Sequence, residues 1–378
     1  MLLSDIKVLD LSGLLPGPLC SLMLADLGAD VIKIESLSGD SMRYADSGRK
    51  KSAYFAAVNR NKKSIAINLK AEEGIKIFMK LAKNSDVIIE GFRPGKANNL
   101  GIGYDKIKKL NPKIVYCSIS GYGQKGSNKN TAGHDLNYIS LSGLLGEITT
   151  KPFVPGIQIA DASSAFIAAF SIVSALLYRQ RKNKGNYIDV SAFQSSLSVM
   201  GIHIAQKSVS KNKNKILSGS KPCYNVYKTK DGRYMSLGAI ENKFWKSFCT
   251  AAERKDLISK QLNEDKKTME EIKEVFKKKT MKEWVLLNKK YDFCCGPVKN
   301  MDEVLNDTEL NSRKILIDLE GTKQVAMPAS FSTVKKIRYS KSPELGEDTD
   351  KLLLELGYDK QSIISLRTRG IILQPKSS

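Results

Sequence analysis

Residues 7–35 read KVLDLSGLLPGPLCSLMLADLGADVIKIE, and this stretch decides the fold class. Residues 7–11 are apolar and short, as in a buried strand, and a turn with glycine and proline follows them. Residues 19–27 have helical spacing and stop at Gly28, and Asp30–Glu35 predicts a second strand. A strand, a helix and another strand within about thirty residues make a βαβ unit, which implies a parallel sheet.

The same alternation continues beyond this unit and predicts a large Rossmann-like domain over residues 1–205. We expect further strands at Ser64–Asn68, Asp86–Glu90 and Lys113–Ser118. Helices are predicted between them, at Ala71–Ala82, up to about Asn98 and at Tyr104–Leu110. The fold class is therefore α/β with a mainly parallel sheet.

The pattern changes after residue 205, where a polar, lysine-rich stretch predicts a linker over residues 206–225. A small α+β domain is expected over residues 226–322, with a strand pair near its start and helical segments after it. Residues 323–378 end in amphipathic helical patterns, which favour a C-terminal segment that packs back on the large domain. The individual elements are expected at Tyr224–Tyr227, Arg233–Leu237, Lys243–Ala252, Thr268–Lys277, Met281–Asn288, Asp348–Leu356 and Lys360–Arg369.

The composition limits which classes of protein the chain can belong to. The chain has 378 residues, of which 42% are hydrophobic, and it contains no unbroken apolar run of the length that spans a bilayer. Its first ten residues do not follow the pattern of a signal peptide, so we expect a cytoplasmic protein that is not held in a membrane. The six cysteines have no zinc-site spacing, and we predict no metal site.

The formal net charge of +22 raises the question of nucleic acid. Lysines are scattered over nearly every polar segment, without a basic stripe, interleaved aromatic residues or a known binding module, so we expect no nucleic-acid partner. A positive field also favours capture of a polyanionic small ligand.

His134 and Asp161 are the strongest candidates for chemistry. His134 is one of two histidines in the chain, and Asp135 follows it directly. Imidazole is suited to reversible proton transfer near neutrality, whereas a lone histidine is also often only a satisfied polar group. Asp161 lies between two apolar runs and could be an N-cap as well as a base. Glu241, in LGAIENKF, could orient an imidazole or be a surface acid.

Cations that could hold an anionic ligand occur at the edges of predicted strands. VNRNKKS supplies Arg60, Lys62 and Lys63 before one strand, and GFRPG supplies Arg93 after another. Glu35 ends a strand where dinucleotide folds carry an acid, but no GxGxxG precedes it. The GxGxxG at residues 121–126 is not followed by a helical pattern, so a glycine-rich active-site loop is favoured there over a cofactor site.

Many segments, in order along the chain, resemble the sequences of the family III CoA-transferase superfamily (CaiB/BaiF type). Within this superfamily the chain resembles the α-methylacyl-CoA racemase branch. They include NRNKKSIAINLK, SDVIIEGFRPG, NPKIVYCSISGYGQKG, GNYIDVSAFQS, YKTKDGRYMSLGAIE and GEDTDKLLLELGY, besides residues 8–35. The racemase branch is distinguished by AGHDLNYISLSGLL around His134 and by GAIE, which ends in Glu241.

This resemblance implies an interlocked homodimer in which each site lies between the large domain of one chain and the small domain of its partner. It implies that His134 and Asp161 are the two bases, that Glu241 pairs with His134, and that Asp135 supports the site. Acyl-CoA is the implied substrate, with no cofactor. Residues that match CoA-binding positions are Arg60 and Arg93, and more loosely Lys33 and Lys70. The arginine that usually follows the acid of the second strand is replaced here by Ser36.

Three hypotheses remain open at this point. The first is a racemase or epimerase that inverts the α-carbon of 2-methylacyl-CoA thioesters by two-base proton transfer. The second is a CoA-transferase in which Asp161 attacks an acyl-CoA and forms an aspartyl intermediate. The third is a basic protein that binds nucleic acid or acyl-CoA without turnover.

Overall fold

The computed structural model describes residues 1–46, 52–148, 151, 153–210 and 217–375. The chain forms two compact units, one built from Met1–Gly201 with Arg313–Ser378 and the other from Ile202–Ser312. These boundaries differ from the predicted ones at both ends of the small domain, because the smaller unit already begins at Ile202, within the predicted large domain, and residues 313–322 belong to the larger unit. Part of the predicted linker, residues 211–216, lies outside the described residues.

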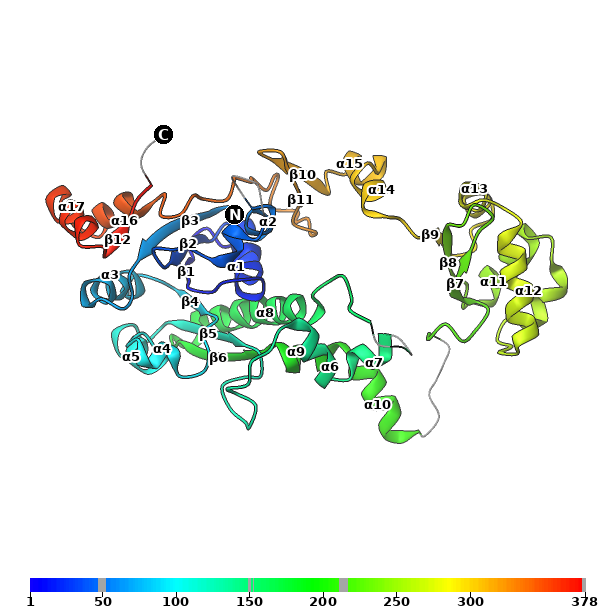
Figure 1. The fold of residues 1–378 in the computed structure, drawn as a ribbon, viewed down its shortest axis with the longest axis horizontal. Coiled ribbons are helices and arrows are strands. Elements are labelled where there is room, and N and C mark those ends of the chain that lie inside the picture. The colour runs from blue at the N-terminus through cyan, green and yellow to red at the C-terminus, as the bar shows by residue number, and fades with distance from the viewer. Residues whose placement is uncertain (47–51, 149–150, 152, 211–216, 376–378) are drawn as a thin grey trace. The chain divides into compact units, whose positions relative to one another are not determined.

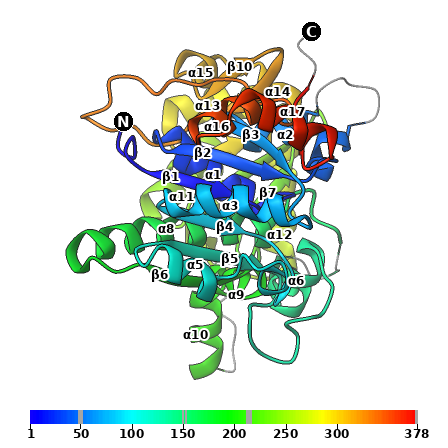
Figure 2. The same ribbon diagram turned by 90° about the vertical axis from the view of Figure 1, so that its left-hand side faces the viewer.

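The larger unit is organised around a seven-stranded sheet in the order β12-β3-β2-β1-β4-β5-β6 (Figures 1 and 2). Every neighbouring pair is parallel except β12 and β3, which are antiparallel. This sheet confirms the predicted α/β class. The strands are β1 Lys7–Asp10, β2 Asp30–Glu35, β3 Lys62–Ile67, β4 Val87–Glu90, β5 Val115–Ser120, β6 Asn186–Ser191 and β12 Ile372–Leu373.

Helices cover both faces of this sheet, so its strands are apolar on both sides, as in other parallel sheets. Along β4, Val87 and Ile89 enter the core on one face and Ile88 enters the core on the other. The face with Ile88 packs against α3 Glu72–Lys83, α5 Tyr104–Leu110, α16 Thr349–Glu355 and α17 Lys360–Thr368. The opposite face packs against α1 Pro16–Asp26 and α8 Ile159–Lys182.

Helix α8 is the one described helix that is long and apolar enough to cross a membrane by length and composition. One side of it packs in the core of the larger unit through Ala165, Ala168 and Ile172. Its other side is an exposed apolar stripe at helical spacing, formed by Phe166, Phe170, Val173 and Leu177. Phe170 is 73% exposed. The core helix of a protein outside the membrane can meet the same criteria of length and composition, and the packed side of α8 accounts for part of its apolar sequence.

The smaller unit has its own three-stranded antiparallel sheet and its own aromatic core. Its strands are β7 Tyr224–Lys228, β8 Tyr234–Gly238 and β9 Cys295–Pro297, and its main helices are α11 Asn242–Ala251, α12 Lys266–Lys277 and α13 Met281–Tyr291. Trp245 and Trp284 are both fully buried in that core. The strand pair and the three helices lie within two or three residues of their predicted positions.

Shorter elements complete both units. They are η1 Ser41–Tyr44, α2 Ala53–Asn59, α4 Lys96–Asn99, α6 Asp135–Leu141, α7 Leu144–Ile148, α9 Ala192–Val199, α10 Gly201–Val209, η2 Lys255–Lys260, α14 Met301–Leu305, α15 Thr308–Ser312, β10 Leu316–Leu319 and β11 Thr322–Val325. The C-terminal segment returns to the larger unit as predicted, since β12 pairs with β3.

Candidate active site

The order of the strands reverses direction between β1 and β4. From β1 the chain builds β2 and β3 on one side, and it then crosses to build β4, β5 and β6 on the other. The loops that leave β1 and β4 diverge at this point, and open α/β sheets bind ligands in the crevice that results. Two adjoining cavities open here, and both are lined by Ser12, Gly13, Leu14 and Gly91.

The smaller cavity, of about 140 Å³, contains both predicted bases. His134 is exposed and directly precedes α6, and its backbone N–H donates to Asn137 Oδ1 at 3.0 Å. Asp161 reaches the same cavity from the first turn of α8. The two side chains come from elements that the sequence alone could not bring together.

Asp161 is partly buried, and its environment disfavours the ionised carboxylate. Burial is the main cause, and the nearby charge of Asp135 adds to it, whereas His134 acts in the opposite direction. Together they raise the pKa of Asp161 from 3.8 to about 6. Asp161 does not act as an N-cap, as one alternative had it, because Gln158 occupies that position.

Asp135 lies behind Asp161 and is 8% exposed. Its Oδ1 accepts a hydrogen bond from the backbone N–H of Asp161 at 3.0 Å. Asp135 therefore ties the start of α6 to the start of α8, and it contributes negative charge beside the Asp161 carboxyl.

The glycines that precede His134 leave room for the aromatic ring of Tyr138. The ring of Tyr138 packs against Gly121 and Gly133, and a Cβ added at Gly121 would lie 2.5 Å from its hydroxyl oxygen. That hydroxyl donates to the carbonyl oxygen of Gly133 at 2.6 Å. Glycines at these two positions allow the aromatic ring to pack beside the small cavity, and Tyr138 also lines that cavity.

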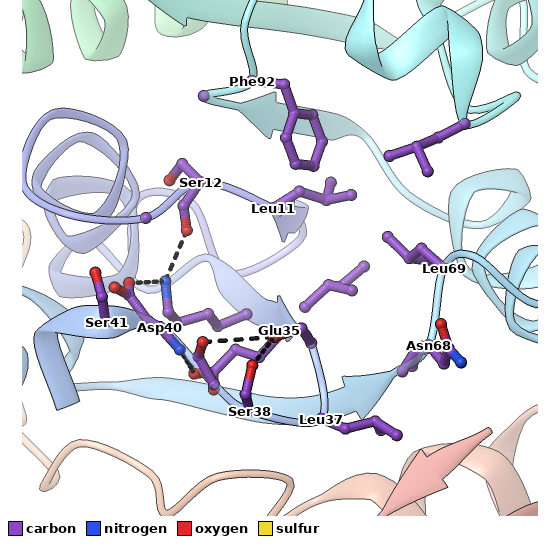
Figure 3. A pocket seen from close by; sticks show the side chains of 18 of the residues that line it. Leu11, Ser12, Glu35, Leu37, Ser38, Asp40, Ser41, Asn68, Leu69 and Phe92 are labelled. Atoms are coloured by element: carbon purple, nitrogen blue, oxygen red, sulfur yellow. Dashed lines mark hydrogen bonds and ion pairs between the residues drawn. The ribbon is translucent and has the colours of Figure 1, made fainter. Parts of the chain in front are cut away.

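The larger cavity, of about 680 Å³, is lined by residues that follow the carboxyl ends of β1, β2, β3 and β4. Leu11, Leu69 and Phe92 face its interior, and Asp40 and Ser41 lie at one end (Figure 3). Lys70 and Lys96 are exposed cations on its wall. Such a mixture of apolar walls and a few charged groups is typical of sites for organic anions.

Lys33 also lines this larger cavity, but its ammonium group is fully buried and already paired. Nζ donates to the carbonyl oxygen of Ser12 at 2.8 Å and lies 3.0 Å from Asp40 Oδ2. These two contacts of Lys33 fix the position of the loop that follows β1. This loop forms a wall of both cavities. The charge of Lys33 is thus largely compensated within the protein.

Arg60 was predicted to bind CoA, and the structure corrects this prediction. Its guanidinium is buried and makes a two-bond ion pair with Asp26, at 3.1 and 2.6 Å, and a further hydrogen bond to Gln324 at 3.0 Å. Neither cavity includes Arg60 in its lining. Its neighbour Lys62 is likewise buried against Asp10, and burial lowers the pKa of Lys62 to about 8.

Two residues at the ends of the strands lie outside the larger cavity or are already paired. Arg93 is exposed and lines a separate pocket, together with Glu90, Tyr116 and Ser118. The carboxylate of Glu35 accepts two hydrogen bonds from Arg43, both of 2.7 Å, which agrees with the absence of a dinucleotide motif before it. Ser36, which replaces the usual arginine, lines the larger cavity with a hydroxyl group 2.9 Å from that of Ser38.

Glu241 belongs to the smaller unit. It is the residue before α11, it is exposed, and its carbonyl oxygen accepts hydrogen bonds from the backbone of that helix. Its side chain makes no capping hydrogen bond. The local structure therefore leaves the carboxylate at the surface of its unit.

Sequence reasoning missed several residues that line the two cavities. Lys96, Asn68 and Leu69 line the larger one, and Ser120 and Ala192 line the smaller one. Most of them follow the carboxyl end of a parallel strand, which is the one signal that could have identified them.

Comparisons with known proteins identify the family. The model of CoA-transferase family III matches residues 3–349. An acyl-CoA transferase of Fusarium pseudograminearum is 32% identical over 98% of this chain and 88% of its own length. The human alpha-methylacyl-CoA racemase is also 32% identical, over 98% of both chains. A crystal structure of a CAIB/BAIF family protein from Brucella suis superposes with a TM-score of 0.82 at 28% identity, covering 93% of this chain and 98% of that one. The chain belongs to CoA-transferase family III.

Proposed function

We propose that the protein is a cofactor-independent racemase or epimerase that inverts the α-carbon of 2-methylacyl-CoA thioesters. The observation that carries this proposal is that His134 and Asp161 line the same cavity of about 140 Å³. A thioester acidifies the α C–H bond, so two bases on opposite sides of that carbon can exchange its proton. No external group is needed for this reaction.

In one direction, the carboxylate of Asp161 removes the α-proton and the electron pair of the C–H bond passes into the enolate. Backbone N–H groups around the cavity stabilise the enolate oxygen. The imidazolium of His134 then donates a proton to the opposite face of the carbon. Asp161 now carries the former α-proton and His134 has lost its own proton, and exchange of both groups with solvent restores the starting state. In the reverse direction the two residues exchange roles.

The electrostatics of Asp161 support a role as base. A carboxylate with the ordinary pKa of 3.8 would be a weak base toward a carbon acid, whereas a pKa of about 6 brings it nearer to the working pH. At neutral pH most of the carboxyl is still ionised. Because the charge of Asp135 contributes to the raised pKa, we assign Asp135 a positioning and tuning role.

We assign the CoA part of the substrate to the larger cavity. Lys70 and Lys96 suit its phosphate groups, and the apolar side chains near Leu69 and Phe92 suit its adenine ring. The walls shared through Ser12 and Gly91 would let the chain of the substrate reach the smaller cavity. Lys33 holds the backbone of Ser12 by a hydrogen bond and so fixes the loop that forms one wall of this site.

A homodimer is part of the proposal. The exposed apolar stripe of α8 is the kind of surface that a second chain covers. We further propose that Glu241 of the partner subunit pairs with His134. In that case, mixing His134→Ala with Glu241→Ala should regenerate one intact site in each mixed dimer, to about a quarter of the wild-type activity after random reassociation. No recovery, with mixed dimers present, would contradict a shared site.

The first test of the activity is proton NMR of (S)- and (R)-2-methylacyl-CoA in D₂O without any free carboxylic acid. Loss of the α-proton signal from both isomers, with collapse of the methyl doublet, is expected. His134→Ala and Asp161→Asn should each abolish exchange from one isomer first. Equal loss from both isomers, or none, would contradict the two-base arrangement.

The CoA-transferase reaction is the second candidate, favoured by the name of the Fusarium relative. Here the Asp161 carboxylate would attack the thioester carbonyl and expel the CoA thiolate, which leaves a mixed anhydride. The thiolate would then attack the aspartyl carbonyl, which releases the donor acid as a carboxylate and leaves an aspartyl-CoA thioester. The acceptor carboxylate would attack this thioester, and the CoA thiolate that is expelled would attack the acceptor's acyl carbonyl in the new anhydride, which gives the new acyl-CoA and frees Asp161. Hydroxylamine or borohydride should then trap Asp161 during turnover with a free acid. A racemase gives no such adduct, so the trapping experiment separates the two reactions.

A further inference from the structure

Three buried charged side chains lie in the neighbouring strands β1, β2 and β3 of the central sheet. They are Asp10, Lys33 and Lys62. Lys33 lines the larger cavity, but neither Asp10 nor Lys62 lines either cavity. The proposed mechanism therefore gives Asp10 and Lys62 no role, although the burial of charged groups is costly unless other contacts compensate for it.

Lys62 binds Asp10 and uses its full capacity for hydrogen bonds. Its Nζ donates to Asp10 Oδ2 at 3.1 Å, to Asn59 Oδ1 at 2.8 Å and to the carbonyl oxygen of Pro18 at 3.0 Å. An ammonium group has three N–H donors, so none is left for a ligand. Lys62 thereby connects the carboxylate of Asp10 to β3, α1 and α2.

The carboxylate of Asp10 in turn holds the loop of residues 12–14. Its Oδ1 accepts the backbone N–H of Ser12 at 3.0 Å and also the hydroxyl of Ser12, while its Oδ2 accepts the hydroxyl of Ser21 at 2.5 Å. Burial by itself would raise the pKa of Asp10, but the charges of the two neighbouring lysines outweigh it and lower this pKa to about 2. Asp10 is therefore ionised at neutral pH.

The loop has a conformation that its own sequence does not favour. Leu14 has a φ of +62°, which a residue other than glycine adopts only where its surroundings impose it. Its backbone N–H donates to Asp40 Oδ1 at 3.4 Å, and the same carboxylate pairs with Lys33. Ser12 packs so closely against α1 that a Cβ on Gly17 would collide with the hydroxyl oxygen of Ser12. Neighbouring groups thus determine the position of this loop.

The position of the loop matters because residues 12–14 line both the larger cavity and the smaller cavity of His134 and Asp161. A substrate that extends from one cavity into the other passes these residues. A misplacement of about 1 Å at a reacting centre can lower a rate about a hundredfold, even when its cause lies away from the chemistry.

We propose that Asp10 and Lys62 are positioning residues for the reaction. Their buried ion pair fixes residues 12–14, so that a thioester whose CoA part fills the larger cavity reaches His134 and Asp161. The inference rests on the proposed function, because it takes the larger cavity as the CoA site and these two side chains as the reacting groups. The pair acts through Ser12 and lines neither cavity, so it should affect turnover much more than the binding of CoA.

The test compares Asp10→Asn with Asp26→Asn in the full-length protein at pH 7, where Lys62, whose pKa is about 8, is charged. An amide at position 10 cannot face both Ser12 and Lys62 with an oxygen, so the loop should lose its anchor. Asp26 is the matched control, since it is a buried acid that pairs with Arg60 at 2.6 Å and lines neither cavity.

Asp10→Asn should speed amide hydrogen exchange at residues 12–14, followed by mass spectrometry. It should also lower the kcat of α-proton exchange, per folded enzyme, by about a hundredfold. The Kd of CoA itself, measured by calorimetry, should change little. Lys62→Met should reproduce these effects, because it leaves the carboxylate of Asp10 without its partner. Asp26→Asn should lower the stability of the protein without changing the loop, the kcat or the Kd.

Three results would overturn the proposal. The first is unchanged hydrogen exchange at residues 12–14 in folded Asp10→Asn or Lys62→Met. The second is an equal fall of kcat per folded enzyme in Asp26→Asn, which would indicate a general loss of stability. The third is a rise in the Kd of CoA that matches the loss of kcat, which would assign the pair to ligand binding. A wild type without α-proton exchange would instead contradict the proposed racemase reaction, and the hydrogen-exchange comparison would still decide whether the pair fixes the loop.

A milder pair of variants serves if Asp10→Asn does not fold. Ser12→Ala and Ser21→Ala each remove one hydroxyl that donates to Asp10, but only Ser12 belongs to the loop. Ser12→Ala should speed hydrogen exchange of the loop and lower kcat, whereas Ser21→Ala should do neither. Equal behaviour of the two variants would contradict the proposal.

Discussion

Asp161→Asn should make the larger unit more stable at neutral and alkaline pH, although it removes a proposed base. A carboxyl group whose pKa is raised in the folded state binds its proton more tightly there than in the unfolded chain. Its contribution to stability is therefore complete below the unfolded pKa and is lost as the pH rises through the folded pKa. Asparagine has the same size and does not titrate.

The size of the effect follows from the pKa of Asp161. The shift from 3.8 to about 6 is equivalent to about 3 kcal/mol at pH 8, at about 1.36 kcal/mol for each pKa unit. At pH 4 the carboxyl is almost fully protonated in the folded state and about 40% protonated in the unfolded chain, and the same relation gives about 0.5 kcal/mol. Because solvent reaches the open side of the cavity and screens the charge, about 3 kcal/mol is an upper limit.

Urea unfolding at pH 4 and pH 8 measures this difference, and the chain offers an internal control. Both of its tryptophans, Trp245 and Trp284, are buried in the smaller unit, so their fluorescence reports that unit. Far-UV circular dichroism also follows the larger unit, which contains α8. The substitution should shift the transition of the larger unit and leave the tryptophan transition in place.

The pH dependence decides the outcome. A gain in the free energy of unfolding that is equal at pH 4 and pH 8 would show that removal of the charge is not its cause. A variant that is less stable than the wild type at pH 8 would contradict the raised pKa itself. In either case, the assignment of Asp161 as a base with a tuned pKa would have to be withdrawn.

Three other substitutions test separate parts of the site. Asp135→Asn keeps an oxygen acceptor for the backbone of Asp161 but removes a charge that raises its pKa, so the acidic limb of the pH profile of α-proton exchange should move below about pH 6; an unchanged limb would refute this coupling. Arg60→Ala leaves Asp26 buried without its partner and should lower the free energy of unfolding by about 3–5 kcal/mol, with no rise in the KM for acyl-CoA in the folded fraction. Lys70→Ala should raise the KM for acyl-CoA with little change in kcat, and the difference from the wild type should shrink at high salt. A fall in kcat alone would instead place Lys70 at the reacting centre.

Much of the fold could be predicted because its signals are local. The βαβ unit of residues 7–35 is visible in a run of thirty residues, since buried parallel strands are continuously apolar and the helix between them has its own period. The same holds for the smaller unit, whose strand pair and helices were expected within a few residues of where they lie. His134 and Asp161, which line one cavity, could be selected as candidates because each stands beside a distinctive local pattern and within a family resemblance.

Tertiary structure decided which charged residues face a cavity. Arg60, Lys33 and Lys70 look alike as cations near strands, but the neighbours brought by the sheet are different for each. Arg60 pairs with Asp26 of α1 and Lys33 pairs with Asp40, whereas Lys70 is exposed on the wall of the larger cavity and forms no ion pair with any residue that the structure describes. The order of the strands, with β1 beside β4, is also set by contacts between distant segments. Local sequence therefore specifies the elements and the kind of chemistry, but long-range packing decides which charges are neutralised inside the protein and which remain to bind a ligand.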